Sequence, residues 1–104
     1  MSDQDIIRLL WFLFAGTRGG DNRIKILDLL IKNPLNINKI SEELQLDYKT
    51  IQHHIRILEK NNLLTRMGDK YGILYFISNY LEKNIESYYT IKKIGTSMIC
   101  NFII

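Results

Sequence analysis

The spacing of apolar residues between positions 47 and 62 predicts an amphipathic helix. Ile51, His54, Ile55 and Leu58 recur at i, i+3, i+4 and i+7, and this spacing places them on one face. At about 100° per residue, the opposite face carries cations and hydrogen-bond donors. That face consists of Lys49, Gln52, His53, Arg56 and Lys60. Such a helix suits a DNA major groove, although a solvated surface explains the same pattern equally well.

The ends of this helix and the segment before it carry local signals. Asp47 can cap the helix, because its carboxylate accepts from the free backbone N–H groups of the first turn. Asn61-Asn62 favours a stop, since asparagine tolerates the left-handed conformation. A shorter helix is expected over residues 37–44, capped by Asn36. Only two residues link it to the next cap, so the pair predicts a helix-turn-helix.

A β-hairpin is expected directly after the helix-turn-helix. Residues 63–67 and 73–77 are rich in apolar, β-branched and aromatic side chains, and a polar, glycine-flanked turn over 68–72 separates them. Arg66 and Lys70 lie at or near the tip of this hairpin.

The first helix is expected over residues 4–15, and its apolar side chains go nearly all the way round. Only Arg8 clearly interrupts them, so the helix needs two partners, of which one could be another subunit. The following run, residues 16–20, lacks the Gly-Lys-Ser/Thr of a nucleotide-binding loop. A phosphate site is conceivable there, but a tight turn with Gly16 and Asp21 as caps is favoured.

Two further helices complete the pattern. Residues 21–32 form a central, buried helix that Asn33-Pro34 stop. The last helix begins at its cap Asn79, with Glu82 at the capping-box position, and Gly95 ends it. The apolar tail, residues 96–104, is expected to dock on something.

Length, charge and candidate chemistry narrow the function. The 104 residues predict a single domain, 1–104, and a net charge of +3 with a pI of about 9.0 is compatible with a polyanionic partner. Cys100 is the lone cysteine, and His53 and His54 point about 100° apart, so no disulfide, metal site or cofactor is expected. No nucleophile, carboxylate pair or cofactor loop indicates an enzyme. No leader or membrane span is evident, and the cytoplasm is the expected location.

Residues 16–95 resemble the winged helix-turn-helix transcription regulators of the ArsR type. Asn36–Leu44 looks like the family's positioning helix. Thr50-Ile51 and His54-Ile55 occupy the Ser/Thr-Val-x-x-His-Leu pattern of its recognition helix. Residues 16–20 followed by Asn22-Arg23 are similar to archaeal members. The paired cysteine and Asp/His ligands of the metal-sensing branch are missing, so metal sensing is not carried over.

The resemblance implies a mainly α-helical fold with a small β-hairpin, the wing. It implies a homodimeric regulator of transcription that binds double-stranded DNA sequence-specifically. The recognition helix, about 47–62, would enter the major groove, and the wing, about 63–77, would follow the backbone or minor groove. The predicted DNA-binding residues are Tyr48, Lys49, Gln52, His53, Arg56, Lys60, Arg66 and Lys70.

The dimer is expected to form through the two ends of the chain, residues 1–16 and 79–104. The predicted interface residues are Ile7, Leu10, Trp11, Phe14, Leu81, Ile85, Tyr88 and Tyr89. Alternatively, the apolar tail folds back within one chain and covers the first helix. Nothing in the sequence identifies a small-molecule effector.

A winged helix that binds protein and never touches DNA is the second hypothesis. Between residues 39 and 70, six basic residues stand against five acidic ones, a thin electrostatic footprint for a DNA reader. Most of the acids lie on the positioning helix and at the cap, away from the basic face.

Overall fold

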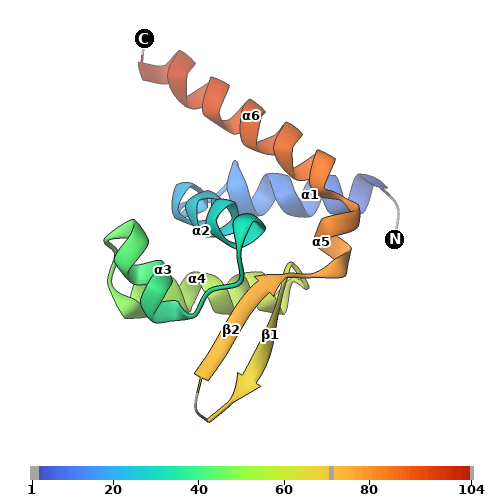
Figure 1. The fold of residues 1–104 in the computed structure, drawn as a ribbon. Helices are drawn as coiled ribbons and strands as arrows, with labels where there is room; N and C mark the ends of the chain where they lie inside the picture. Colours follow the sequence, from blue (N-terminus) through green and yellow to red (C-terminus); the bar gives the residue numbers. More distant parts are fainter. Residues whose placement is uncertain (1–2, 71, 104) are drawn as a thin grey trace. The chain divides into compact units, whose positions relative to one another are not determined.

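The structure is a computed structural model that describes residues 3–70 and 72–103, with side chains described for 4–70 and 72–94. Its elements in chain order (Figure 1) are α1 (Asp3–Phe14), α2 (Gly20–Lys32), α3 (Ile37–Leu44), α4 (Tyr48–Lys60), β1 (Leu64–Asp69), β2 (Gly72–Ile77), α5 (Asn79–Lys83) and α6 (Ile85–Ile103). The chain forms two compact units. One contains the residues up to Ile24 and those from Asn84 onward, and the other is Lys25–Lys83.

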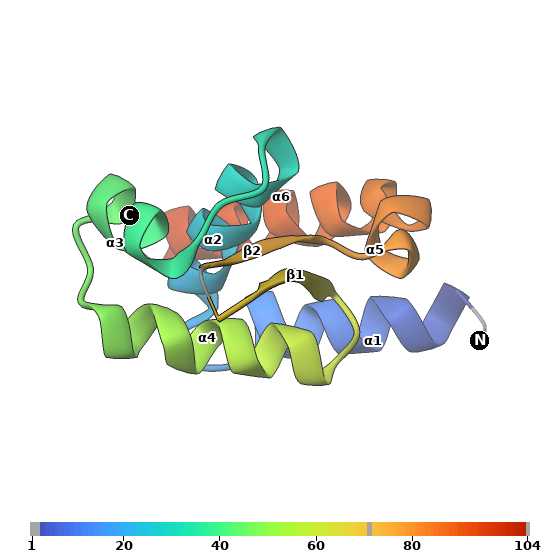
Figure 2. The same cartoon turned by 60° about the horizontal axis from the view of Figure 1, so that its bottom comes forward.

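The unit Lys25–Lys83 contains the predicted winged helix-turn-helix. β1 and β2 pair antiparallel, from Leu64 opposite Ile77 to Asp69 opposite Gly72. Figure 2 shows α4 running alongside this hairpin, with α3 near the beginning of α4. Leu35 adds a short bridge to the free side of β2, exchanging two backbone hydrogen bonds of 2.8 and 3.1 Å with Tyr75. The wing is therefore tied to the segment that leads into α3.

The two helices of the helix-turn-helix have the predicted caps. The Asn36 side chain accepts a 2.7 Å hydrogen bond from the Lys39 backbone N–H, and Asp47 accepts from the Thr50 N–H at 3.2 Å. The turn between the helices depends on Gln45, whose φ of 55° lies in the left-handed region. That conformation lets the N–H groups of Gln45 and Leu46 both return to the Ser41 carbonyl.

The predicted stop of α4 at Asn61-Asn62 is confirmed, and two other predicted boundaries in this unit need correction. Helix α4 ends at Lys60, and Asn62 takes the left-handed conformation, with φ of 62°. The strands extend into the predicted turn, because Gly68 adopts a φ of 133° and still pairs with Ile73. Ser78 caps α5 in place of Asn79, since its hydroxyl accepts from the Leu81 N–H at 3.1 Å.

The last predicted helix is two helices. The helix is interrupted at Asn84. The carbonyl of Asn84 accepts from the N–H groups of Ser87 and Tyr88 and so begins α6. Helix α6 continues through Gly95 to Ile103. A glycine inside a helix costs only about 1 kcal/mol relative to alanine, which is too little to stop a long helix. The expected docking of the tail concerns side chains that lie outside the described residues.

In the other unit, α1 packs on α6. The rings of Phe14 and Tyr88 meet edge to face with their centroids 5.3 Å apart. Leu10 and Leu13 are buried, whereas Phe12, with 59% of its surface exposed, and Trp11 face outward. Among the described residues, no helix is long and apolar enough to cross a membrane.

The glycine-rich segment between α1 and α2 is the favoured tight turn. Gly20 approaches α1 so closely that a Cβ there would lie 2.5 Å from the Phe14 carbonyl oxygen. Helix α2 begins at Gly20, so Asp21 lies in its first turn. The buried Arg23 guanidinium donates to the Leu13 carbonyl at 2.8 Å and to the Thr17 hydroxyl at 2.7 Å. Burial lowers the pKa of Arg23 from its ordinary value. Arg23 thus holds this turn together through hydrogen bonds.

Candidate nucleic-acid interface

The two faces of α4 are as the periodicity predicts. Ile51, His54, Ile55 and Leu58 are buried. The predicted contact residues on this helix lie outside: Tyr48, Lys49, His53, Arg56 and Lys60 are exposed, and Gln52 is half-buried. The helix therefore presents a row of cations and donors on one side, because its other side is packed in the core.

Asp47 fixes where this row begins. Its two carboxylate oxygens accept from Thr50, one from the hydroxyl at 2.6 Å and one from the backbone N–H at 3.2 Å. These hydrogen bonds lower the pKa of Asp47, so the carboxylate stays ionised at neutral pH. The cap starts the helix at Tyr48 and leaves Lys49 in its exposed first turn.

On the wing, Arg66 is exposed but is not directed away from the protein. Its Nε and Nη2 each donate to one carboxylate oxygen of Glu59, both at 2.8 Å. This pairing raises the pKa of Arg66 above its ordinary value. The sequence does not reveal the contact with Glu59, because the two residues are seven positions apart across the junction between a helix and a strand. Lys70, the other predicted wing residue, is exposed beyond the end of β1.

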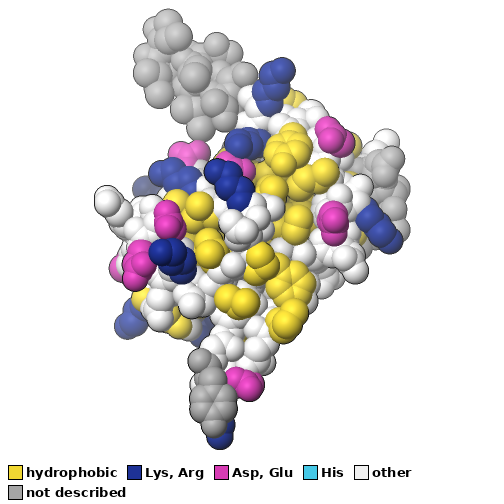
Figure 3. Space-filling view, in the orientation of Figure 1, with side chains coloured by type: hydrophobic (Ala, Val, Ile, Leu, Met, Phe, Trp, Pro, Cys, Tyr) yellow, Lys and Arg dark blue, Asp and Glu magenta, His cyan; other side chains and the backbone are white. Residues whose placement is uncertain are grey.

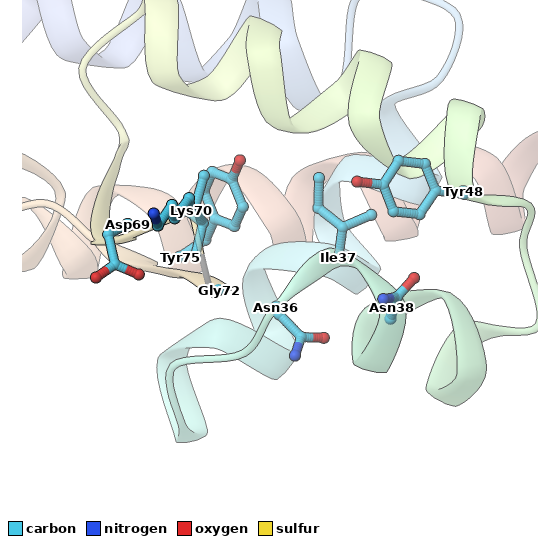
Figure 4. Close-up of a pocket in the computed structure, with 9 residues that line it drawn as sticks. Asn36, Ile37, Asn38, Tyr48, Asp69, Lys70, Gly72 and Tyr75 are labelled. Carbon is cyan, nitrogen blue, oxygen red and sulfur yellow. The ribbon is translucent and has the colours of Figure 1, made fainter.

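A groove of about 380 Å³ lies between the wing and the helix-turn-helix. It is lined by Asn36, Ile37, Asn38, Tyr48, Asp69, Lys70, Gly72, Ile73 and Tyr75. Figure 4 shows Ile37 and Tyr48 together on the helix side of the groove, and Lys70 and Tyr75 on the hairpin side. Within this lining, the asparagine amides, the tyrosine phenols and the Lys70 ammonium are groups that can donate hydrogen bonds to an oxyanion. The carboxylate of Asp69 sits at the hairpin side and would oppose one.

The wing exposes one apolar cross-strand pair. Met67 and Leu74 lie opposite each other in the hairpin register, with 62% and 45% of their surfaces exposed. Figure 3 shows hydrophobic side chains gathered over the part of the surface where Figure 1 places the hairpin. This pair was not among the predicted functional residues.

The adjacent histidines differ in environment. His54 is buried and His53 is exposed, with ring centroids 5.3 Å apart. Within the part of the chain whose side chains are described, no group of His, Cys, Asp and Glu is arranged to hold a metal ion.

The predicted dimer residues fall into two groups. Leu10, Phe14, Leu81 and Tyr88 are buried within a single chain. Ile7, Trp11 and Tyr89 are exposed, and Ile85 is half-buried.

Comparisons with known proteins agree with this architecture. Residues 20–66 match the family model "Bacterial regulatory protein, arsR family". No curated protein matches the sequence. The similarity of residues 16–23 to archaeal regulators therefore remains a prediction from the sequence.

Solved structures of similar fold include three bacterial proteins. The transcriptional regulator HlyU of Vibrio vulnificus is 18% identical, with a TM-score of 0.62 over 89% of this chain and 85% of its own. The transcriptional repressor BigR of Xylella fastidiosa is 8% identical, with a TM-score of 0.65 over 94% and 88%. A double mutant of ZitR from Lactococcus lactis is 16% identical, with a TM-score of 0.63 over 79% and 58%. The chain thus has the winged-helix fold of ArsR-type regulators, and its residues 20–66 match the arsR family model.

Proposed function

We propose that this protein is a transcription regulator that binds double-stranded DNA sequence-specifically as a homodimer in the cytoplasm. The observation that carries the proposal is the outer face of α4. Its cations are exposed on a helix whose opposite face is buried in a helix-turn-helix. The arsR family match covers this region. HlyU and BigR, which share the fold, are themselves described as a transcriptional regulator and a transcriptional repressor.

In the proposed complex, α4 enters the major groove, which is wide enough to admit an α-helix. Lys49 and Arg56 are suited to guanine, and Gln52 to adenine, because their donors and acceptors match those base edges. Tyr48, His53 and Lys60 flank these contacts. Lys70 on the wing binds phosphate, which positions the protein and carries no sequence information.

The proposed dimer uses the exposed apolar side chains of α1 and α6. Ile7, Trp11 and Phe12 face outward on α1, and Tyr89 and Ile94 face outward on α6. Burying a side chain of this size contributes about 1.5–3 kcal/mol. A twofold dimer would place two copies of α4 in successive major grooves, about 34–36 Å apart.

The test is the affinity for duplex DNA, measured by fluorescence anisotropy over a range of salt concentrations. Wild-type protein should bind random duplex at low salt, with affinity falling as salt rises, and a selected operator more tightly. Arg56→Ala should weaken operator binding by about 1–3 kcal/mol if Arg56 contacts a base. Lys32→Ala, which removes one charge from the end of α2, is the matched control and should have a smaller effect. Equal effects of the two variants would remove Arg56 from the reading face.

The second candidate is a winged helix that binds protein and no DNA. The exposed Met67–Leu74 pair favours it, because apolar side chains exposed on a hairpin are suited to a protein partner. Absence of binding to any duplex at low salt would contradict the first candidate and favour this one.

A further inference from the structure

Glu59 and Arg66 connect the recognition helix to the wing. The guanidinium of Arg66, in β1, and the carboxylate of Glu59, near the end of α4, share two parallel hydrogen bonds of 2.8 Å. Only 18% of the Glu59 side chain is exposed. A forked arginine–carboxylate pair fixes the relative orientation of its two side chains, which a single hydrogen bond does not.

Tyr75 extends this connection to the rest of the wing. Arg66 lies opposite Tyr75 in the hairpin, and its guanidinium carbon is 5.7 Å from the centroid of the Tyr75 ring. The Tyr75 side chain is buried, and its backbone pairs with Leu35 just before α3. An uninterrupted series of contacts therefore runs from α4 through both strands to the beginning of α3. The same residue, Tyr75, lines the groove between the wing and the helix-turn-helix.

We propose that Glu59 is a positioning residue for DNA binding, which holds the wing in a fixed orientation to α4 through Arg66 and Tyr75. This inference rests on the proposed function. Glu59 then raises the affinity for DNA, although Glu59 and DNA are both negatively charged. Arg66 then acts through its partner within the protein, and Lys70 is the wing cation that meets phosphate.

Charge alone predicts the opposite sign. A carboxylate near DNA repels phosphates, so its removal should strengthen binding. Removing the Glu59 carboxylate would also free the Arg66 guanidinium to pair with a phosphate. The sign of the change in affinity therefore separates positioning from simple charge.

The experiment compares Glu59→Gln, Arg66→Gln and the double variant with wild type, on one operator duplex at several salt concentrations. Each single variant should weaken binding about two- to fivefold, the range that a coupled exposed pair provides. The double variant should bind no more weakly than the weaker single variant, because either change already breaks the pair. Glu43→Gln is the matched control, since Glu43 is an acid 3.6 Å from Lys39 on α3. It should bind as wild type or more tightly.

Arg66→Lys tests positioning separately from charge, because the substitution leaves the net charge unchanged. It keeps the cation but loses the fork, so it should bind as weakly as Arg66→Gln if positioning matters. Melting curves verify that each variant is folded at the assay temperature. Wild-type affinity or tighter binding in Glu59→Gln, or Arg66→Lys at wild-type affinity, would overturn the inference while leaving DNA binding intact. Failure of the wild type to bind any duplex would overturn the inference and the proposed function together.

Discussion

At the scale of single residues, short-range hydrogen bonds place the helix that carries the candidate interface. Asp47 accepts from Thr50 at both carboxylate oxygens, and this lowers its pKa in the folded protein. Arg23 does comparable work for the turn after α1, where it holds the Leu13 carbonyl and the Thr17 hydroxyl. Asp47 and Arg23 thus both hold the backbone next to a helix end through hydrogen bonds.

The lowered pKa of Asp47 makes the cap sensitive to acid. A carboxyl group with a folded pKa below its unfolded value of about 3.9 stabilises the protein above that value. The stabilisation is lost as the pH falls through the folded pKa. Wild type should therefore exceed Asp47→Asn in melting temperature at pH 7, and the difference should shrink as the pH falls below about 4. A difference that stays constant from pH 7 to pH 2 would show that the charge of Asp47 does not contribute.

Lys70 is expected to act on DNA affinity without affecting sequence preference. Phosphate contacts release counterions, so Lys70→Ala should weaken binding to all duplexes alike and lower the salt slope by about one unit. The measurement is the affinity for two unrelated duplexes over a series of salt concentrations. A loss confined to one sequence would place Lys70 at a base rather than at the backbone.

At the scale of elements, the conformation of single turn residues decides whether the helix-turn-helix and the wing keep their geometry. Gln45 and Gly68 both have positive φ. Glycine accepts that conformation freely, whereas a side chain with a Cβ is strained in it.

Gln45 is therefore a strained residue in the turn between α3 and α4. Gln45→Gly should relieve that strain and stabilise the protein by about 0.5 kcal/mol, after the higher entropy of the unfolded glycine chain is subtracted. Gln45→Ala keeps the Cβ and is the control, which should give no gain. Chemical denaturation measures both. A destabilised Gln45→Gly variant would mean that the Gln45 side chain makes a contribution larger than the strain.

The hairpin offers a matched pair of glycines. A Cβ at Gly68 would overlap the Gly72 carbonyl oxygen, in addition to the strain of its φ of 133°. A Cβ at Gly72 would meet nothing within 4 Å. Gly68→Ala should thus disorder the wing and weaken DNA binding, while Gly72→Ala should leave both nearly unchanged. Amide hydrogen exchange in residues 64–77 reports the order of the wing, and equal protection in the two variants would contradict the prediction.

Much of the fold could be predicted because its signals are local. Asn36 and Asp47 are caps that act within three residues, and the buried face of α4 follows from spacing alone. No glycine or proline marks the interruption at Asn84, so the apolar periodicity across α5 and α6 predicts a single helix. The pairs Glu59–Arg66 and Leu35–Tyr75 depend on the path of the chain through a turn, which spacing does not specify. These contacts are evident only in the folded structure.

At the scale of the whole molecule, the two units carry different proposed tasks. The unit Lys25–Lys83 contains the candidate DNA interface, and the unit built from both ends of the chain contains the exposed apolar side chains of α1 and α6. Helix α2 contributes residues to both units.

The proposed dimer predicts which surface controls self-association. Wild-type protein should sediment as a dimer at micromolar concentration, and Trp11→Glu should shift it to monomer, because a charge cannot be buried cheaply in an apolar interface. Met67→Glu changes an exposed apolar side chain on the wing and should leave the dimer intact. A monomeric wild type would remove the dimer and the expectation of a palindromic operator. Dissociation by Met67→Glu alone would move the interface to the wing.

The bridge between Leu35 and Tyr75 has a consequence for the order of folding. It closes a loop of about forty residues, and closing such a loop costs about 3 kcal/mol of chain entropy. Its two hydrogen bonds return about 1 kcal/mol each, so the bridge cannot form early on its own. It must follow α3, α4 and the hairpin, which bring its ends together. The bridge between Leu35 and Tyr75 is therefore expected to form last and to open first in the native state.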